Sequence, residues 1–315
     1  MFVHPTAPTA PAATETTGGI GRRTLSDELN FLLTNRIPRR LATRFMGWFS
    51  KLPTGPLTRV IIMVWRAFCP DLDLSDSRLS RFRCLHDCFI RELRPGARPV
   101  DETADVVTSP VDAIVGAHGR VDGTRVFQAK GFPYSLRDLF GDDEPVARYA
   151  SGTYVTLRLK ASFYHRFHAP CDAVLRRVVY RSGDTWNVNP IALRRVQALF
   201  TKNERAIVEL DVGHGQSLAL VAVAAILVAS IRLHCLGPGG SVRQLAGHVS
   251  TPDVRVRKGE ELGWFEHGST MLVFAPADFQ LAPGLHDGQL VRVGRPLLLR
   301  PGPVPVANPV FPATE

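Results

Sequence analysis

After residue 100 the chain becomes a succession of short apolar runs, and this texture limits its possible folds more than any other feature. The runs are rich in Val, Ile, Leu, Tyr and Phe, and Gly, Pro and Asp residues separate them. Short runs of this kind between turn residues are typical of antiparallel strands. We therefore predict a mainly β domain over 101–315. Strands are expected at 113–117, 154–159, 173–180, 206–210, 218–231 and 270–274.

The first hundred residues have a different, helical pattern. Residues 1–24 are rich in Ala, Thr, Pro and Gly and contain no apolar h-region, so they are predicted to be a disordered tail and not a signal peptide. Apolar residues then recur at helical spacing, and Pro38 should break or kink the first helix. Helices are expected at 25–52, 57–68 and 76–95. The chain is thus predicted to be an α+β protein with an N-terminal amphipathic helical region over 25–100.

The helical region is strongly basic. Between Asn35 and Arg66 there is no acidic residue, and there are seven basic ones: Arg36, Arg39, Arg40, Arg44, Lys51, Arg59 and Arg66. Arginines beside Trp and Phe on amphipathic helices suit the headgroup boundary of a membrane, where each adds at most about 1 kcal/mol. The alternative is a helical pair packed on the protein's own core, with solvated arginines.

The formal net charge of +9 suggests an anionic partner, which can be nucleic acid, an acidic membrane surface or a phosphate-bearing substrate. No apolar run is long enough to cross a bilayer. Five cysteines without a C-x-x-C pair argue against a disulfide framework and fit a reducing compartment. Cys84 and Cys88, with His86 between them, would share a helix face, but no second ligand pair stands nearby, so ordinary burial is favoured over a metal site.

The pair Gly268-Ser269 precedes a short apolar run that is predicted to be a buried strand. Because glycine has no Cβ, the hydroxyl of Ser269 can approach the Gly268 carbonyl and attack its own preceding peptide bond. The simpler interpretation is a glycine turn with a serine that bonds backbone at the strand end. A serine nucleophile also requires a base, and the base requires an orienting carboxylate.

Candidates for these partners are present elsewhere in the chain. His165 and His168 lie in F-Y-H-R-F-H-A-P-C-D, where they can be a proton-handling pair, a metal site or two unrelated polar side chains. Asp112, in T-S-P-V-D-A, is the best carboxylate, although an aspartate after proline is usually a turn residue. Ser217, in G-Q-S-L-A, nearly forms the nucleophile elbow of a serine hydrolase, but the final glycine is missing.

Taken together, the motifs resemble those of the phosphatidylserine decarboxylases, specifically the bacterial membrane-associated type. The resemblance extends from about residue 26 to residue 299. It rests on the order and spacing of C-F-I-R-E-L-R-P-G-A-R-P-V (88–100), S-P-V-D (109–112), Q-A-K-G-F-P-Y-S-L (128–136), Y-H-R-F-H-A-P-C-D (164–172), V-N-P (188–190), L-F-T-K-N-E-R (199–205) and G-S-T-M-L-V-F-A-P (268–276).

The resemblance implies that Asp112, His168 and Ser269 form a triad for self-cleavage, in which His168 is the base and Asp112 holds its imidazole. Cleavage between Gly268 and Ser269 would leave a large chain and a small chain that begins with a pyruvoyl group made from Ser269. This covalent pyruvate cofactor, without pyridoxal phosphate or a metal, would form a Schiff base with phosphatidylserine. Loss of CO2 would yield phosphatidylethanolamine, and His165 would aid decarboxylation or reprotonation.

The same resemblance implies the partners and the location. The partners are phosphatidylserine in an anionic membrane and the protein's own large and small chains as a heterodimer, with further dimerisation left open and no nucleic acid. The location is peripheral, on the cytoplasmic side of the cell membrane. Two other classes compete: a serine hydrolase that uses Ser217, and an unprocessed membrane-binding or anion-binding relative without activity.

Three positions depart from the family pattern. His267 precedes Gly268, Ala113 follows Asp112, and Ala173 stands where a glycine is usual. The alanines predict that the backbone at these two positions does not take a positive φ angle. His267 adjoins the predicted cleavage site and can alter the rate of processing or simply face solvent.

Overall fold

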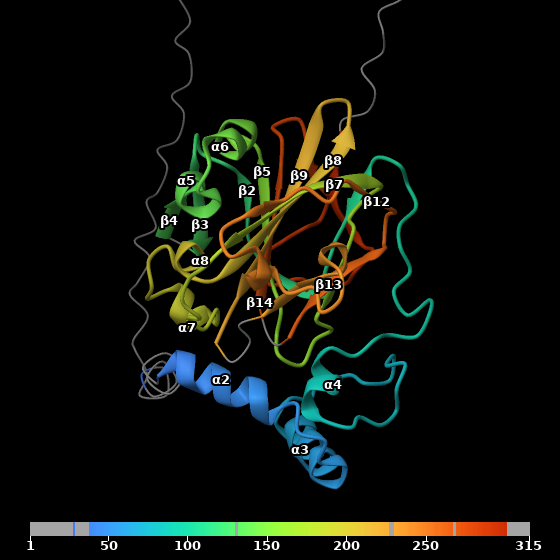
Figure 1. The fold of residues 1–315 in the computed structure, drawn as a ribbon. Coiled ribbons are helices and arrows are strands. Elements are labelled where there is room, and N and C mark those ends of the chain that lie inside the picture. The colour runs from blue at the N-terminus through green and yellow to red at the C-terminus, as the bar shows by residue number, and fades with distance from the viewer. Residues whose placement is uncertain (1–27, 29–37, 130–131, 227–229, 267–268, 301–315) are drawn as a thin grey trace, which may run out of the picture.

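The computed structural model describes residue 28 and residues 38–129, 132–226, 230–266 and 269–300. The described residues are built around a nine-stranded sheet in the order β11-β7-β8-β9-β14-β5-β2-β16, with β12 also paired to β7 (Figure 1). All its strand pairs are antiparallel. The strands are β2 (Ala113–Arg120), β5 (Thr153–Arg158), β7 (Ala173–Arg181), β8 (Arg205–Gly213), β9 (Gln216–Ala224), β11 (Val249–Ser250), β12 (Val254–Val256), β14 (Ser269–Ala275) and β16 (Leu290–Val291).

Three smaller antiparallel sheets accompany it in the described part of the chain. The first contains β1 (Val106–Thr108), β17 (Pro296–Leu299) and β15 (Gln280–Leu281). The second contains β10 (Ile231–Leu233), β13 (Glu261–Phe265) and β6 (Arg166–His168). The third is the hairpin of β3 (Arg125–Ala129) and β4 (Phe132–Ser135).

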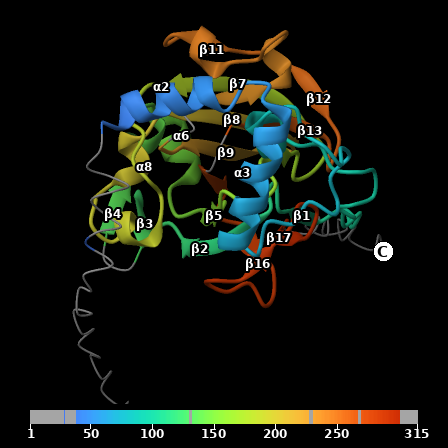
Figure 2. The same ribbon diagram turned by 90° about the horizontal axis from the view of Figure 1, so that it is seen from below.

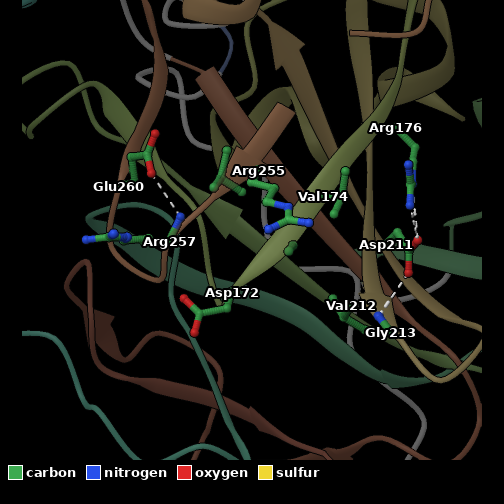
Figure 3. Close-up of a pocket in the computed structure, with 11 residues that line it drawn as sticks. Asp172, Val174, Arg176, Asp211, Val212, Gly213, Arg255, Arg257 and Glu260 are labelled. Atoms are coloured by element: carbon green, nitrogen blue, oxygen red, sulfur yellow. Dashed lines mark hydrogen bonds and ion pairs between the residues drawn. The ribbon is translucent and has the colours of Figure 1, made fainter. Parts of the chain in front are cut away.

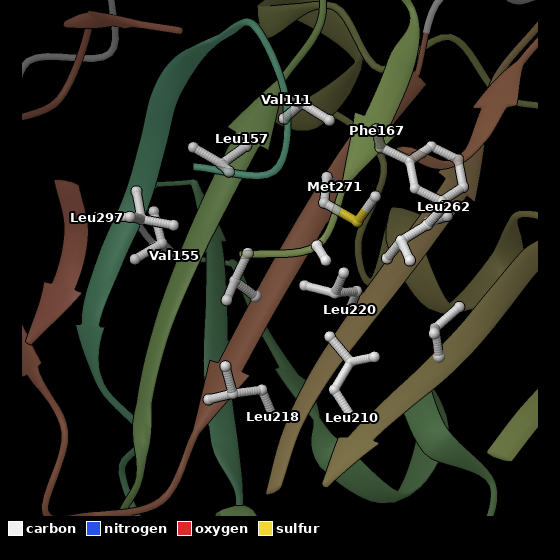
Figure 4. Packing of buried hydrophobic residues seen from close by; sticks show 14 of the residues in the cluster. Val111, Val155, Leu157, Phe167, Leu210, Leu218, Leu220, Leu262, Met271 and Leu297 are labelled. Atoms are coloured by element: carbon white, nitrogen blue, oxygen red, sulfur yellow. The ribbon is translucent and has the colours of Figure 1, made fainter. Parts of the chain in front are cut away.

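Both faces of the large sheet are buried, and β14 shows why. Its side chains alternate between two hydrophobic clusters, with Met271 and Val273 in one and Leu272 and Phe274 in the other. Figure 4 shows the first cluster, where Met271 packs among residues of the large sheet and of the strands that cover it, such as Phe167 of β6. A strand that is buried on both faces has a continuous apolar sequence, which agrees with the run after Ser269.

Helices cover the other face. The second cluster joins the sheet to residues of four short helices, including Phe140, Tyr149 and Phe200. Phe140 and Tyr149 both pack on Phe274, with ring centroids 5.3 and 6.1 Å away. These helices are α5 (Leu136–Phe140), α6 (Asp143–Tyr149), α7 (Pro190–Leu193) and α8 (Leu199–Lys202). Two 3-10 turns complete the fold, η1 (His234–Leu236) and η2 (Val242–Leu245).

Two longer helices, α2 (Arg39–Phe49) and α3 (Gly55–Phe68), lie across one end of the molecule (Figure 2). Arg39 fastens α2 to the β domain, because its guanidinium pairs with Asp184 at 2.6 Å and lies 3.7 Å from the centroid of the Trp186 ring. Helix α3 packs on α4 (Leu85–Phe89) through the rings of Trp65 and Phe89, whose centroids are 4.7 Å apart. None of the described helices is long and apolar enough to span a membrane.

The α+β, mainly β architecture is confirmed, and α2 begins directly after Pro38 as predicted. Two local predictions were wrong. Most of 76–95 is not helical, because Ser77 bridges Leu93 and only α4 forms. The run 218–231 is not one strand, since β9 ends at Ala224 and β10 begins at Ile231. The predicted tail, 1–24, lies outside the described residues.

Candidate active site

Strand β14 begins at Ser269, and the hydroxyl of this residue is buried without a partner. The residue is 0% exposed, and it lies opposite Ala224 of β9. Its Oγ atom has no hydrogen-bond partner among the described residues. An unpaired buried hydroxyl costs roughly 1–3 kcal/mol, so such a group in a native fold calls for a functional explanation.

Two backbone hydrogen bonds hold the chain on either side of the predicted cleavage site. The amide of Leu159 donates to the carbonyl of Ser269 over 2.9 Å, and the amide of Phe265 donates to the carbonyl of His165 over 2.9 Å. Residues 267–268, which lie between these two anchors and directly precede Ser269, are outside the described residues. The loop that runs from Leu159 to His165 therefore brings a histidine to the segment that precedes Ser269.

The imidazole of His165 is also buried and unpartnered. The residue is 0% exposed, and neither ring nitrogen has a hydrogen-bond partner within the described ranges. The rings of His165 and Phe89 pack edge to face, with their centroids 5.9 Å apart and an angle of 70° between their planes. Burial and, secondarily, the charge of Arg91 lower the pKa of His165 to about 3, although an interaction with the backbone of Phe163 acts in the opposite direction. The imidazole is therefore neutral near pH 7 and keeps one N–H and one lone pair for a ligand.

His168, in β6, is held as a neutral base with a defined tautomer. Its Nδ1 lies 2.8 Å from the carbonyl oxygen of Gly259, which can only accept, so Nδ1 carries the hydrogen. Its Nε2 is the acceptor for the Tyr164 hydroxyl at 2.9 Å. Burial lowers the pKa of His168, although the Gly259 carbonyl and the charges of Glu261 and Asp112 act in the opposite direction. The lone pair that can take a proton is on Nε2.

Asp112 lies near His168 but is bonded to other groups. Its carboxylate receives two N–H groups of Arg98, at 2.9 Å from Nε and 2.6 Å from Nη2, and the backbone amide of Val293 at 2.9 Å. The backbone amide of His168 donates to the carbonyl of Pro110, two residues before Asp112. The hydrogen bond that we predicted from Asp112 to the imidazole is not formed between these two described residues, because Gly259 occupies Nδ1.

Four residues of the site were not predicted: Arg91, Arg98, Tyr164 and Gly259. Tyr164 directly precedes His165 in the same motif, so its position in the sequence could have pointed to it. Gly259 could not have been found, because a backbone carbonyl 91 residues away from His168 leaves no mark in a sequence.

The departures from the family pattern are compatible with the fold. Ala113 begins β2 and Ala173 begins β7, and neither is among the described residues with positive φ angles, as predicted. His267 and Gly268 lie outside the described residues, so the influence of His267 on processing stays a prediction.

The alternative nucleophile, Ser217, is poorly placed for hydrolase chemistry. It lies within β9, is 9% exposed, and its hydroxyl is 3.2 Å from the Tyr149 hydroxyl. A hydrolase elbow instead exposes its serine on a sharp turn between a strand and a helix. In the described part of the chain no three His, Cys, Asp or Glu residues are grouped so that they could hold a metal ion.

A cavity of about 860 Å³ lies at the end of β8 that contains Asp211 and Gly213 (Figure 3). Ser269 lies near the opposite end of this strand. Its charged lining is largely engaged within the protein. Asp211 pairs with Arg176 at 3.1 Å, and Glu260 accepts the backbone amide of Arg257 at 2.9 Å. The volume of this cavity therefore does not identify the reacting site.

Comparison with known proteins gives consistent matches. The family model described as phosphatidylserine decarboxylase matches residues 85–299. The phosphatidylserine decarboxylase proenzyme of Methylibium petroleiphilum is 36% identical over 284 residues, which cover 88% of this chain and 99% of that protein. Proenzymes of the same name from Vibrio parahaemolyticus and Anaeromyxobacter sp. are 33% and 36% identical, each over 87% of this chain and 99% of their own length. The range matched by the family model contains Asp112, His165, His168 and Ser269.

Proposed function

This chain belongs to the phosphatidylserine decarboxylase family, and from that premise we propose that Ser269 cleaves its own backbone to mature the enzyme. The mature protein is a carboxy-lyase of phospholipid biosynthesis that converts phosphatidylserine into phosphatidylethanolamine. One combination of observations supports Ser269 as the reacting residue: its buried, unpartnered hydroxyl lies at the first position of a central strand, directly after a glycine and inside the range matched by the family model.

Self-cleavage begins with attack of the Ser269 Oγ on the carbonyl carbon of Gly268. His168 takes the hydroxyl proton on Nε2 and returns it to the amide nitrogen as the C–N bond breaks, which leaves an ester between the two residues. Elimination of the ester frees the Gly268 carboxylate, and hydrolysis of the remaining dehydroalanine releases ammonia and leaves a ketone. A positioned base of this kind contributes typically about 10²–10⁴-fold.

Asp112 supports this base without touching the imidazole. Its negative charge raises the proton affinity of His168, against the effect of burial. Two residues before it, the carbonyl of Pro110 accepts the backbone amide of His168 over 2.9 Å. We therefore assign Asp112 as a positioning residue for self-cleavage, with Arg98 as the group that holds it.

The surroundings of Ser269 fit a covalent pyruvoyl group. Before the reaction, the Oγ atom of Ser269 has no hydrogen-bond partner in the described residues. The ring nitrogens of His165 are also unpaired there and can bind a substrate. When formed, the pyruvoyl ketone supplies an acceptor for the substrate's amine and for the electrons released with CO2. His165 is neutral at working pH, so it can move a proton at the carbon that loses CO2.

The two chains left by cleavage should stay together as a heterodimer. The small chain would contain β14, which is hydrogen-bonded to β5 on one side and β9 on the other. It would also contain β16 and β17, which pair with β2 and β1. Each of these four partner strands belongs to the large chain.

Exposed apolar side chains on α2 and α3 support peripheral docking on a membrane that contains the anionic substrate. Their exposure ranges from 47% for Val64 to 82% for Phe68. The set is Leu41, Phe45, Trp48, Leu57, Val60, Met63, Val64 and Phe68. Because a helical pair packed on the core would bury such a set, the interfacial alternative is favoured. The exposed Arg44, Arg59 and Arg66 add positive charge to the same helices, which suits the cytoplasmic face of the cell membrane.

Mass spectrometry of the purified protein tests the proposal. We expect a fragment of residues 269–315 whose amino end carries a keto group, and we expect Ser269→Ala to remain one uncleaved, inactive chain. Normal decarboxylation by Ser269→Ala, or active wild-type protein without the keto group, would refute the mechanism. An intact wild-type chain that binds vesicles would instead favour an unprocessed binding protein.

A further inference from the structure

Glu266 is the last described residue before the predicted cleavage site, and its carboxylate is buried between two cations. The residue is 8% exposed. Its Oε1 lies 3.3 Å from Nζ of Lys51, and it receives Arg232 through Nη2 at 3.1 Å and Nε at 3.3 Å. A carboxylate with so little access to water depends on these partners for its charge.

The two cations come from distant parts of the chain. Lys51 lies in the turn between α2 and α3, and Arg232 is the central residue of β10. The turn itself is docked, because the amide of His86 in α4 donates to the carbonyl of Ser50 over 2.8 Å. The two amphipathic helices are therefore joined through Lys51 to the chain segment that leads into Ser269.

Charges in this cluster keep Glu266 ionised. Burial would raise its pKa, but Lys51, Arg232 and His86 outweigh burial and hold the pKa of Glu266 below its ordinary value. For His86 burial is the largest effect and lowers its pKa, although Glu266 and Asp87 oppose it. The ion pairs with Lys51 and Arg232 are thus the interactions that fix the Glu266 side chain.

The backbone is fixed at the same place. The amides of Phe265 and Glu266 donate to the carbonyls of His165 and Ser230 over 2.9 and 3.1 Å. Both the main chain and the side chain are therefore anchored immediately ahead of 267–268. A group two residues from Gly268 that is held in this way can determine where the attacked carbonyl lies.

We propose that Lys51, Arg232 and Glu266 form a positioning cluster for self-cleavage, through which the docked turn between α2 and α3 holds the segment that presents Gly268 to Ser269. The inference rests on the self-cleavage proposed above and adds a requirement that the triad alone does not contain. In the described part of the chain the Glu266 side chain makes no hydrogen bond to Ser269, His165 or His168, so it acts through the geometry of the segment. A displacement of about 1 Å in a reacting group can cost about 10²-fold in rate.

Cell-free synthesis of the full chain, followed by timed separation of intact and cleaved protein, measures the effect. We expect Lys51→Met, which keeps the length of the side chain but not its charge, to slow cleavage at least about tenfold. Lys51→Arg should cleave within about twofold of the wild-type rate, because the charge is kept. Glu266→Gln keeps the shape of the carboxylate and should slow cleavage as Lys51→Met does.

The double variant Lys51→Met/Glu266→Gln separates positioning from a general loss of stability. If the two residues act as a pair, Lys51→Met should have little further effect once Glu266 is Gln, whereas independent effects on stability would multiply. Arg78→Ala is the matched control, since Arg78 forms an exposed ion pair with Glu92 in the same N-terminal part of the chain, and this variant should cleave normally.

Cleavage of both Lys51→Met and Glu266→Gln at the wild-type rate would overturn the inference, as would full multiplicativity in the double variant. Both results require a wild-type chain that cleaves. A wild-type chain that never cleaves would refute the proposed maturation itself, so the two failures can be distinguished.

Discussion

The hydroxyl of Tyr164 donates to Nε2 of His168 over 2.9 Å, and Nε2 is the nitrogen that takes the proton of Ser269 in the proposed self-cleavage. Since Nδ1 is bonded to the Gly259 carbonyl, neither ring nitrogen of His168 has a free lone pair in this structure. The proposed mechanism therefore requires that Nε2 be released from Tyr164 before cleavage.

Tyr164→Phe should make self-cleavage faster. A typical hydrogen bond is worth about 0.5–1.5 kcal/mol net, so its removal should raise the first-order cleavage rate roughly two- to tenfold. The rate is measured by timed electrophoresis after cell-free synthesis. Tyr134→Phe is a suitable control, because Tyr134 is also buried but its hydroxyl has no partner in the described residues. Slower cleavage of Tyr164→Phe would show that Tyr164 positions the base and does not mask it.

Asp112→Asn should slow self-cleavage at least about tenfold, because it removes the negative charge that supports the proton affinity of His168 and unbalances the half-buried Arg98. Asp76→Asn tests the same arginine from its other side, since Asp76 accepts from Nη1 of Arg98 at 2.9 Å and is more exposed. We expect Asp76→Asn to have a much smaller effect. Equal rates for the two variants would remove the special role of Asp112.

His165→Gln should impair turnover more than maturation. Its imidazole is assigned to proton movement at the substrate, so we expect a loss of about 10²-fold or more in CO2 release per cleaved chain. Cleavage, followed by mass spectrometry on the same sample, should change only severalfold. If cleavage and turnover fell by the same factor, a separate role for His165 would be excluded.

The stability of the folded protein should fall with decreasing pH in part through His165. Its folded pKa is about 3 and its ordinary value is 6.5, so between these values the unfolded chain binds a proton that the folded chain does not. This contribution is complete above about pH 6.5 and is lost as the pH falls toward 3, with a slope of at most roughly 1.4 kcal/mol per pH unit. Denaturant unfolding of uncleaved Ser269→Ala should show a steeper pH dependence than Ser269→Ala/His165→Gln; identical slopes would contradict the buried neutral state.

Replacing Met63 and Phe68 by Ser should weaken binding to vesicles that contain phosphatidylserine. The side chains are 64% and 82% exposed on α3, so their loss should cost membrane affinity with little cost in stability. Co-sedimentation at low and high salt measures both the apolar and the electrostatic part. Leu290→Ser, at a 51% exposed position on β16, is the control and should bind normally. No difference between acidic and neutral vesicles for the wild type would count against docking on an anionic surface.

The parts of the fold that follow from local pattern could be predicted, and those that depend on distant contacts could not. The run after Ser269 was recognisable as a buried strand because both of its faces are apolar. The end of β9 could not be recognised from sequence, because the run 218–231 stays apolar beyond Ala224. In 76–95 the helical spacing was overridden by tertiary bonds, among them that of Arg91 to the carbonyl of Ser162.

The site shows the same division. The motif around His165 and His168 and the pair Gly268-Ser269 carry their chemistry in their own residue types, so they could be named from sequence. The partner of His168 Nδ1 could not, because the pairing of β6 with β13 brings the Gly259 carbonyl there. Asp112 was expected to hold the imidazole, but its carboxylate binds Arg98, and this contact depends on how two turns meet.

The position of β14 also makes maturation a checkpoint on folding. Its neighbours β5 and β9 come from far earlier in the chain, and the anchors on both sides of the cleavage site come from the loop between β5 and β6. Contacts so distant in sequence form late and slowly. A nascent or misfolded chain would therefore not form its own pyruvoyl group. The appearance of this reactive carbonyl would show that the strands of the surrounding sheet have paired.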